Sequence, residues 1–220
     1  MSSRENILGR VREKLGRSAA TASNDRAAIE NYLAARTQGP RPKIDAELLL
    51  RFREKSELLS STIEIVAASQ AVPQAVARYL AAHRLAPQAV CWPELAELPW
   101  QEAGIAVEVR AATGSGLLGI TGCFCALAET GTLVLCSGPG TPATTSLLPE
   151  THIAIVPASR ILSGMEEAWN LIRRELEESQ KLPRAVNFIS GPSRTGDIEQ
   201  TIVLGAHGPY RVHIVIVQEE

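Results

Sequence analysis

The residues best suited to bind a ligand lie in one stretch, 188–200, with the sequence FISGPSRTGDIEQ. We expect an apolar strand to run into a Gly/Ser/Thr loop, after which a helical turn can begin at Thr195 or Asp197. Ligands of open parallel sheets bind beyond the carboxyl ends of the strands. Loop amides, hydroxyls and a guanidinium at such a place favour a phosphate or a carboxylate. We therefore predict a site for a small anionic or nucleotide-like ligand formed by Ser190, Gly191, Ser193, Arg194, Thr195, Asp197 and Glu199.

The same loop has a simpler interpretation. It lacks the Gly-Lys-Ser/Thr of a Walker loop. Thr195 could act only as a helix cap, with Asp197 and Glu199 complementing the helix dipole. The spacing alone leaves both interpretations open.

A second candidate is Glu129, the only acidic residue between Glu108 and Glu150. Apolar runs flank it, and a desolvated carboxylate there would have a raised pKa, which suits acid–base or nucleophilic chemistry. Together with Thr130 it would line the ligand pocket. The alternative is an exposed hairpin tip in which Gly131 makes the turn.

A third candidate is His207, which lies between Gly205 and Gly208. Flanking glycines allow the backbone to approach a ligand closely, so this imidazole could shuttle a proton or donate a hydrogen bond. A purely structural loop histidine is the competing interpretation.

Three cysteines could also do chemistry. Cys123 and Cys125 would share one face of a strand, and Cys136 would lie across a hairpin from them. They could hold an iron–sulfur cluster or a metal, but the sequence has no CxxC pair, and small buried thiols are commoner at such positions. We therefore expect no cofactor in this chain and a reducing compartment.

Composition narrows the function classes. The 220 residues have 22 basic and 24 acidic side chains, a net charge of -2, and 45% hydrophobic residues. This balance gives no basic footprint for nucleic acid. No apolar run approaches the roughly 20 residues of a membrane span, and Met1–Arg10 does not resemble a secretory signal. We expect a cytoplasmic protein.

Charge and periodicity predict two regions. Residues 1–60 carry a net charge of +4 and contain apolar residues at helical spacing, such as Ile7, Val11 and Leu15, so we predict an N-terminal helical region there. Residues 61–220 carry a net charge of -6 and alternate short apolar strands with helices. This rhythm predicts a single α/β domain with a mostly parallel sheet. The close apolar runs 123–128 and 132–136 predict a β-hairpin insertion.

Three segments taken together resemble the LUD-domain family, in its lactate-utilization C branch. They are AETGTLVL at 128–135, SLLPETHI at 146–153, and SGPSRTGDIE at 190–199 running into GAHGP at 205–209. The resemblance extends over nearly the whole chain and is strongest after Gly119. It implies a fold related to the sugar-phosphate isomerase and CoA-transferase superfamily.

The resemblance also implies a pathway. Members act as one of three proteins that oxidise L-lactate to pyruvate, and the two partner subunits carry the iron–sulfur clusters. We therefore expect a non-redox subunit, with Glu129 and His207 shaping the pocket of the Ser190–Glu199 loop. Two alternatives stay open: a stand-alone CoA-transferase, isomerase or ATP-dependent ligase that uses Glu129, and a scaffold whose basic helical arm organises the iron–sulfur subunits.

Overall fold

The computed structural model describes residues 3–16, 19–44, 47–114, 118–176, 182–196 and 203–219. The chain divides into two units, Met1–Arg41 and Pro42–Glu220. This division precedes the boundary that the sequence suggested at residue 60. The reason is helix α3 (Leu48–Leu58), whose Phe52 is fully buried in the core of the second unit.

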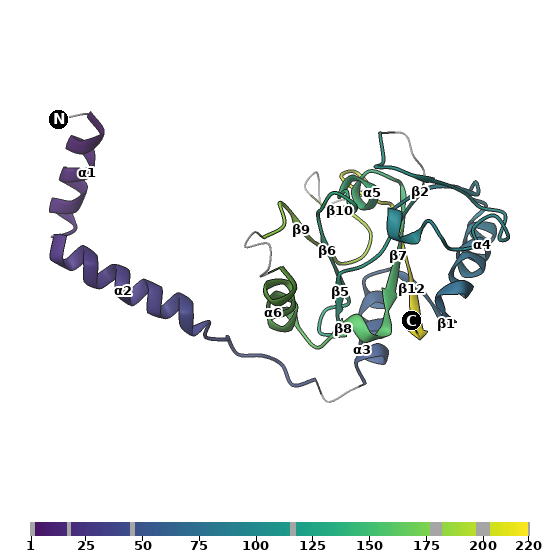
Figure 1. Ribbon diagram of the computed structural model, residues 1–220, viewed down its shortest axis with the longest axis horizontal. Coiled ribbons are helices and arrows are strands. Elements are labelled where there is room, and N and C mark those ends of the chain that lie inside the picture. Colours follow the sequence, from purple (N-terminus) through teal and green to yellow (C-terminus); the bar gives the residue numbers. More distant parts are fainter. Residues whose placement is uncertain are drawn as a thin grey trace. The chain divides into compact units, whose positions relative to one another are not determined.

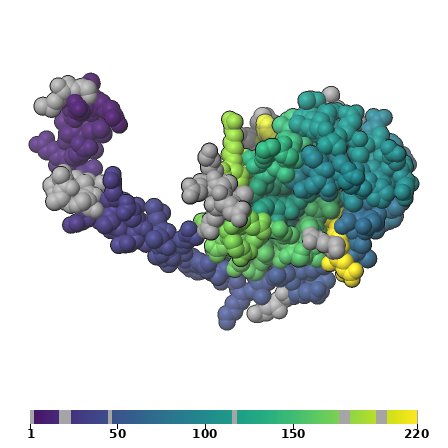
Figure 2. Space-filling model, in the orientation of Figure 1, coloured from purple at the N-terminus to yellow at the C-terminus, as the bar shows by residue number. Residues whose placement is uncertain are grey.

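The first unit consists of helices α1 (Ser3–Lys14) and α2 (Ala19–Ala35). The apolar spacing predicted a helix around Ile7 and Val11, and α1 forms there. None of the side chains of α1 is buried. Almost all described side chains of the two helices are exposed, and the space-filling view shows them at the molecular surface (Figure 2). Isolated helices of this length are marginal in water, so packing must supply their stability.

The second unit is organised around a parallel sheet. In the described part of the chain it has six strands, in the order β1-β12-β7-β4-β2-β3, and every neighbouring pair is parallel. The strands are β1 (Thr62–Ala68), β2 (Gln88–Cys91), β3 (Ala106–Val109), β4 (Leu118–Thr121), β7 (Thr151–Pro157) and β12 (Arg211–Glu219). The predicted α/β fold with a mostly parallel sheet is confirmed.

Side-chain alternation divides the core between the two faces of this sheet. Val215 and Val217 of β12 point to the face that helix α4 (Val72–His83) covers, where Val76 and Leu80 complete the cluster. Ile214 and Ile216 of the same strand point to the opposite face. Both faces of the central strands are therefore buried, as expected for a parallel sheet.

A second, four-stranded sheet covers the opposite face, in the order β8-β5-β6-β9 (Figure 1). Its strands are β5 (Cys125–Leu127), β6 (Thr132–Cys136), β8 (Ile161–Leu162) and β9 (Val186–Ile189). Strands β5 and β6 form the predicted hairpin, closed by residues 128–131. Helix α6 (Met165–Leu176) packs on the outer face of this sheet through Ala168, Leu171 and Ile172.

Short elements connect these layers. They are the 3-10 helices η1 (Ser69–Ala71), η2 (Pro93–Leu95) and η3 (Ala158–Arg160), helix α5 (Thr144–Leu147), and the paired strands β10 (Arg194–Thr195) and β11 (Val203–Leu204). At Arg194–Thr195, where a helical turn could have begun, the chain is therefore extended. No helix in the described ranges is both long and apolar enough to cross a membrane.

Candidate ligand site

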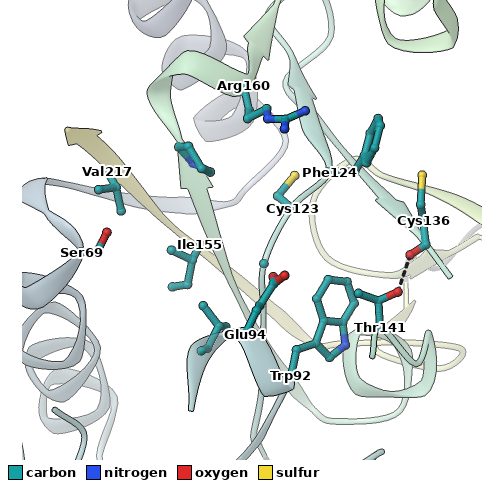
Figure 3. Close-up of a pocket in the computed structure, with 13 residues that line it drawn as sticks. Ser69, Trp92, Glu94, Cys123, Phe124, Cys136, Thr141, Ile155, Arg160 and Val217 are labelled. Carbon is teal, nitrogen blue, oxygen red and sulfur yellow. Dashed lines mark hydrogen bonds between the residues drawn. The ribbon is translucent and has the colours of Figure 1, made fainter. Parts of the chain in front are cut away.

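The carboxyl ends of five parallel strands converge on one cavity. Its volume is about 410 Å³, within the range of small-molecule pockets. Residues at or just beyond the ends of β1, β2, β4, β7 and β12 line it, together with the end of β6 and its following loop (Figure 3): Ser69, Trp92, Glu94, Leu95, Gly122, Cys123, Phe124, Cys136, Thr141, Ile155, Pro157, Arg160 and Val217. This is the edge at which parallel sheets bind their ligands.

Glu94 brings a carboxyl group to this cavity. Strand β2 ends at Cys91, and Pro93 starts the short helix η2 that carries Glu94. The neighbouring Trp92 is buried, and its indole Nε1 donates to the carbonyl oxygen of Pro142 at 3.2 Å. Glu94 is partly exposed to solvent, but the apolar wall beside it removes part of the water around its carboxylate. This desolvation raises the pKa of the carboxyl group.

Arg160 brings a positive charge to the same cavity from the end of η3. Its Nη1 donates to Glu175 Oε1 at 2.7 Å, and its guanidinium carbon lies 5.8 Å from the ring centroid of Phe124. These contacts fix the guanidinium beside an aromatic wall. Its hydrogen bond within the described residues uses Nη1, which leaves Nε and Nη2 as donors for a ligand.

Thiols form another part of the wall. Cys123 and Cys136 line the cavity, and Cys125 is fully buried between the four-stranded sheet and helix α6. Burial is the main cause that raises the pKa of Cys125 to about 12 and that of Cys136 to about 11, and it also raises the pKa of Cys123. Protonated thiols are poor nucleophiles. Within the described residues, no group of three or more His, Cys, Asp or Glu side chains is arranged to hold a metal ion.

The predicted anion loop lies elsewhere, and its first residue belongs to a row of hydroxyl groups. Ser190 Oγ is 2.7 Å from Thr132 Oγ1, which is in turn 2.7 Å from Thr130 Oγ1. Thr132 thus links two of the predicted ligand residues, Ser190 and Thr130. The row ties the end of β9 to the hairpin.

The next residues of the loop fasten it to helix α3. Gly191 has φ +80°, and a Cβ there would lie 2.3 Å from the carbonyl oxygen of Leu59. Arg194 donates from Nη2 to that same carbonyl oxygen at 3.2 Å and also to the hydroxyl of Ser60. The Arg194 guanidinium therefore satisfies acceptors at the end of a helix.

Ser193 joins this loop to the glycine-flanked histidine. Its N–H donates to the carbonyl oxygen of Pro209 at 2.9 Å, and its carbonyl accepts from Gly205 N–H at 2.9 Å. His207 lies in the same 205–209 loop and is exposed. Of the remaining predicted residues, Thr195 lies in β10, whereas Asp197 and Glu199 lie outside the described residues.

Glu129 occupies a third position. Its N–H donates to the carbonyl oxygen of Ser163 at 3.0 Å, and a Cβ on Gly164 would lie 2.8 Å from Glu129 Oε2. The carboxylate is therefore half-buried beside the start of α6. The tip of the hairpin also contacts α3, because Ser56 Oγ donates to the carbonyl oxygen of Gly131 at 3.2 Å.

Strand direction explains why the loop and the cavity are separate. The 205–209 loop precedes β12, and Leu59 and Ser60 precede β1, so the Ser190–Thr195 segment lies at the amino edge of the parallel sheet. The cavity lies at the carboxyl edge. Sequence reasoning missed Glu94 and Arg160, although each follows a strand, β2 or β7, and that position was the available signal.

Comparison with known proteins decides the family. The LUD domain profile matches residues 49–217. The chain belongs to the LUD domain family. A solved relative, a DUF162 family protein from Deinococcus radiodurans, is 25% identical with a TM-score of 0.60, and the match covers 80% of this chain and 99% of that one. The resemblance drawn from the sequence is confirmed.

Curated members of the family are similar over part of their length. Lactate utilization protein C 1 of Bacillus mycoides is 45% identical over 47% of this LUD chain and 44% of that protein. Lactate utilization protein C of Bacillus subtilis is 41% identical over 46% of this chain and 42% of that protein. The Bacillus licheniformis protein of the same name is 34% identical over 58% of this chain and 54% of that protein. The chain thus spans about half the length of the curated relatives it matches.

Proposed function

We propose that this LUD protein takes part in L-lactate utilization, as a ligand-binding, non-redox subunit of a three-protein system that oxidises lactate to pyruvate in the cytoplasm. Two iron–sulfur subunits are its partners in this proposal. The names of the similar proteins support the pathway. The chemistry of electron transfer is assigned to the partners.

One observation supports ligand binding. Five parallel strands end around a cavity that holds a carboxyl group, Glu94, and a guanidinium, Arg160. The predicted loop also offers donors, but Arg194 already donates to Leu59 and Ser60. We therefore assign the small anionic ligand to the cavity.

A deletion strain tests the pathway. In a strain without another lactate dehydrogenase, deletion of the gene should abolish growth on L-lactate and leave growth on pyruvate unchanged. The wild-type gene and a Glu97→Gln variant, which changes an exposed acid three residues from Glu94, should restore growth. A Glu94→Gln/Arg160→Gln double variant, if folded, should not. Normal growth of the deletion strain on L-lactate would refute the proposed pathway.

The desolvated carboxyl of Glu94 favours a second function, in which the chain is an enzyme in its own right. An acid–base residue in a cavity can transfer protons to and from a bound substrate. Incubation of the purified chain with acyl-CoA or sugar phosphates separates the two functions. Turnover without any partner, lost in Glu94→Gln and kept in Glu97→Gln, would favour the enzyme.

A further inference from the structure

We infer that the cavity at the carboxyl edge takes an amphipathic monocarboxylate larger than lactate, with its acid group on Arg160 and its apolar body against the aromatic wall. This inference rests on the proposed function in that it concerns the same ligand site. It adds the chemical class of the ligand and the orientation in which it binds.

The walls determine the apolar part of the ligand. Apolar side chains form most of the lining, and two of them, Trp92 and Phe124, are aromatic. Ile155 and Val217 add aliphatic surface. A volume of about 410 Å³ lies in the range of drug-sized ligands, so a three-carbon acid would leave most of the space to water. A longer apolar body displaces that water, which is favourable.

Arg160 determines the position of the acid group. Its Nη1 donates to Glu175, while Nε and Nη2 are adjacent donors on the same planar group. Two parallel N–H donors match the two oxygens of one carboxylate. The contact between the guanidinium and the Phe124 ring holds that plane in place before the ligand arrives.

Charge favours a monoanion over a phosphate dianion. Glu175 Oε1 lies 2.7 Å from Arg160 Nη1, and the Glu94 carboxyl group lines the same cavity, so one cation and two acidic groups are already present at or beside the cavity. A second negative charge on the ligand would find no cation of its own among the lining residues. Like charges at short range raise the free energy of the complex.

Glu94 determines the orientation. In Figure 3 its carboxyl and the Arg160 guanidinium lie on opposite sides of Cys123. A carboxyl group can accept a hydrogen bond from a hydroxyl or an N–H on the ligand. The acid end of the ligand therefore lies at Arg160, and any donor on its body lies towards Glu94.

Fluorescence of 1-anilinonaphthalene-8-sulfonate tests this inference on the full-length protein. The probe combines one negative charge, an apolar body and one N–H donor. It should bind at a single saturable site, and Arg160→Gln should raise its dissociation constant about tenfold. The matched control Arg174→Gln, on the exposed surface of α6, should leave the constant unchanged. Glu175→Gln, which keeps Arg160 and removes its ion pair, should tighten binding.

Competition identifies the ligand class. Octanoate should displace the probe, whereas L-lactate and inorganic phosphate at the same concentration should not. An unchanged dissociation constant in folded Arg160→Gln overturns the inference, and so does displacement by phosphate. Displacement by L-lactate at lower concentration than octanoate overturns the size argument and leaves the proposed function standing. Normal growth of the deletion strain on L-lactate would instead refute the proposed function and leave this inference standing.

Discussion

The carboxyl group of Glu94 lies against the backbone of Gly122, so closely that a Cβ on this glycine would be 1.8 Å from Glu94 Oε1. The two residues follow neighbouring strands, because β2 and β4 pair through Cys91 and Ile120. The φ angle of Gly122 is not in the left-handed region. Glycine is therefore needed here because it has no Cβ, and any larger residue would displace the Glu94 carboxyl group from its position in the cavity.

Gly122→Ala should move that carboxyl group with little effect on folding. The obstructing atom is the end of a flexible side chain, so the expected loss in the free energy of unfolding is below about 1 kcal/mol. The displaced Glu94 carboxyl should no longer accept a hydrogen bond from the N–H of the anilinonaphthalene probe, so binding of the probe should weaken roughly fivefold. Urea unfolding and a fluorescence titration measure the two effects. Gly140→Ala, where an added Cβ meets nothing within 4 Å, is the control.

Two histidines buried in the central strands predict how stability depends on pH. His152 Nε2 is 2.8 Å from Thr121 Oγ1, and His213 Nδ1 is 2.8 Å from Thr62 Oγ1. The second ring nitrogen of each is buried and has no hydrogen-bond partner in the described ranges. Burial lowers the pKa of both imidazoles to about 4. The native protein therefore keeps them neutral at pH values where the unfolded chain protonates them.

The contribution of these two histidines to the free energy of unfolding should be constant above pH 6.5 and should fall as the pH drops from 6.5 to 4. Each histidine contributes up to about 3 kcal/mol to this loss, because the unfolded state binds the proton first. Urea titrations across this range measure it. His152→Gln and His213→Gln should each reduce the slope, whereas exposed His207→Gln should not. A slope that all three variants share with the wild type would contradict the assignment.

Much of the body could be predicted from the sequence, because local periodicity reports it directly. The apolar residues of Val212–Val217 predict a strand, and the closely spaced runs around Gly131 predict a hairpin. What local patterns do not report is which sheet a strand joins. Strand β9 resembles a parallel strand that ends in a ligand loop, yet it pairs antiparallel with β6.

The same limit explains the candidate site. The Ser190–Thr195 residues combine polar groups in one short segment, so sequence reasoning finds them easily. The cavity residues are separated along the chain: Glu94 and Arg160 are 66 positions apart by their numbers and meet only through the order β7-β4-β2 in the sheet. Helix α3 was assigned to the basic N-terminal region for a similar reason, since the packing of Phe52 on β-strands is a long-range contact.

The thiol of Cys136 should react slowly although it lines an open cavity. Burial and the nearby negative charge of Glu175 raise its pKa to about 11, so little thiolate exists at neutral pH. Alkylation by iodoacetamide, followed by mass spectrometry, should accelerate as the pH approaches 11. Glu175→Gln should speed the reaction at pH 8, and octanoate should slow it. Rapid labelling of Cys136 at pH 7 in the native protein would contradict the raised pKa.

Arg194 should matter for stability more than for ligand binding. Its guanidinium donates to Leu59 and Ser60 at the end of α3. Arg194→Met should therefore lower the free energy of unfolding by about 1 kcal/mol and leave the affinity for the anilinonaphthalene probe unchanged. If a folded Arg194→Met protein instead lost lactate-dependent growth without loss of stability, the Ser190–Glu199 loop would be the functional anion site.

Gly131 and Gly104 form a matched pair that isolates the contact between the hairpin and α3. Both have positive φ, +68° and +72°, so alanine at either position costs about 1–2 kcal/mol in backbone strain. A Cβ at Gly104 meets nothing within 4 Å, but at Gly131 it would lie 2.4 Å from the backbone nitrogen of Ser56. Backbone cannot move aside cheaply, and the bond from Ser56 Oγ would also break. Gly131→Ala should therefore cost roughly 2 kcal/mol more than Gly104→Ala in urea unfolding. Equal losses would mean that the hairpin, and with it Glu129, is not held against α3.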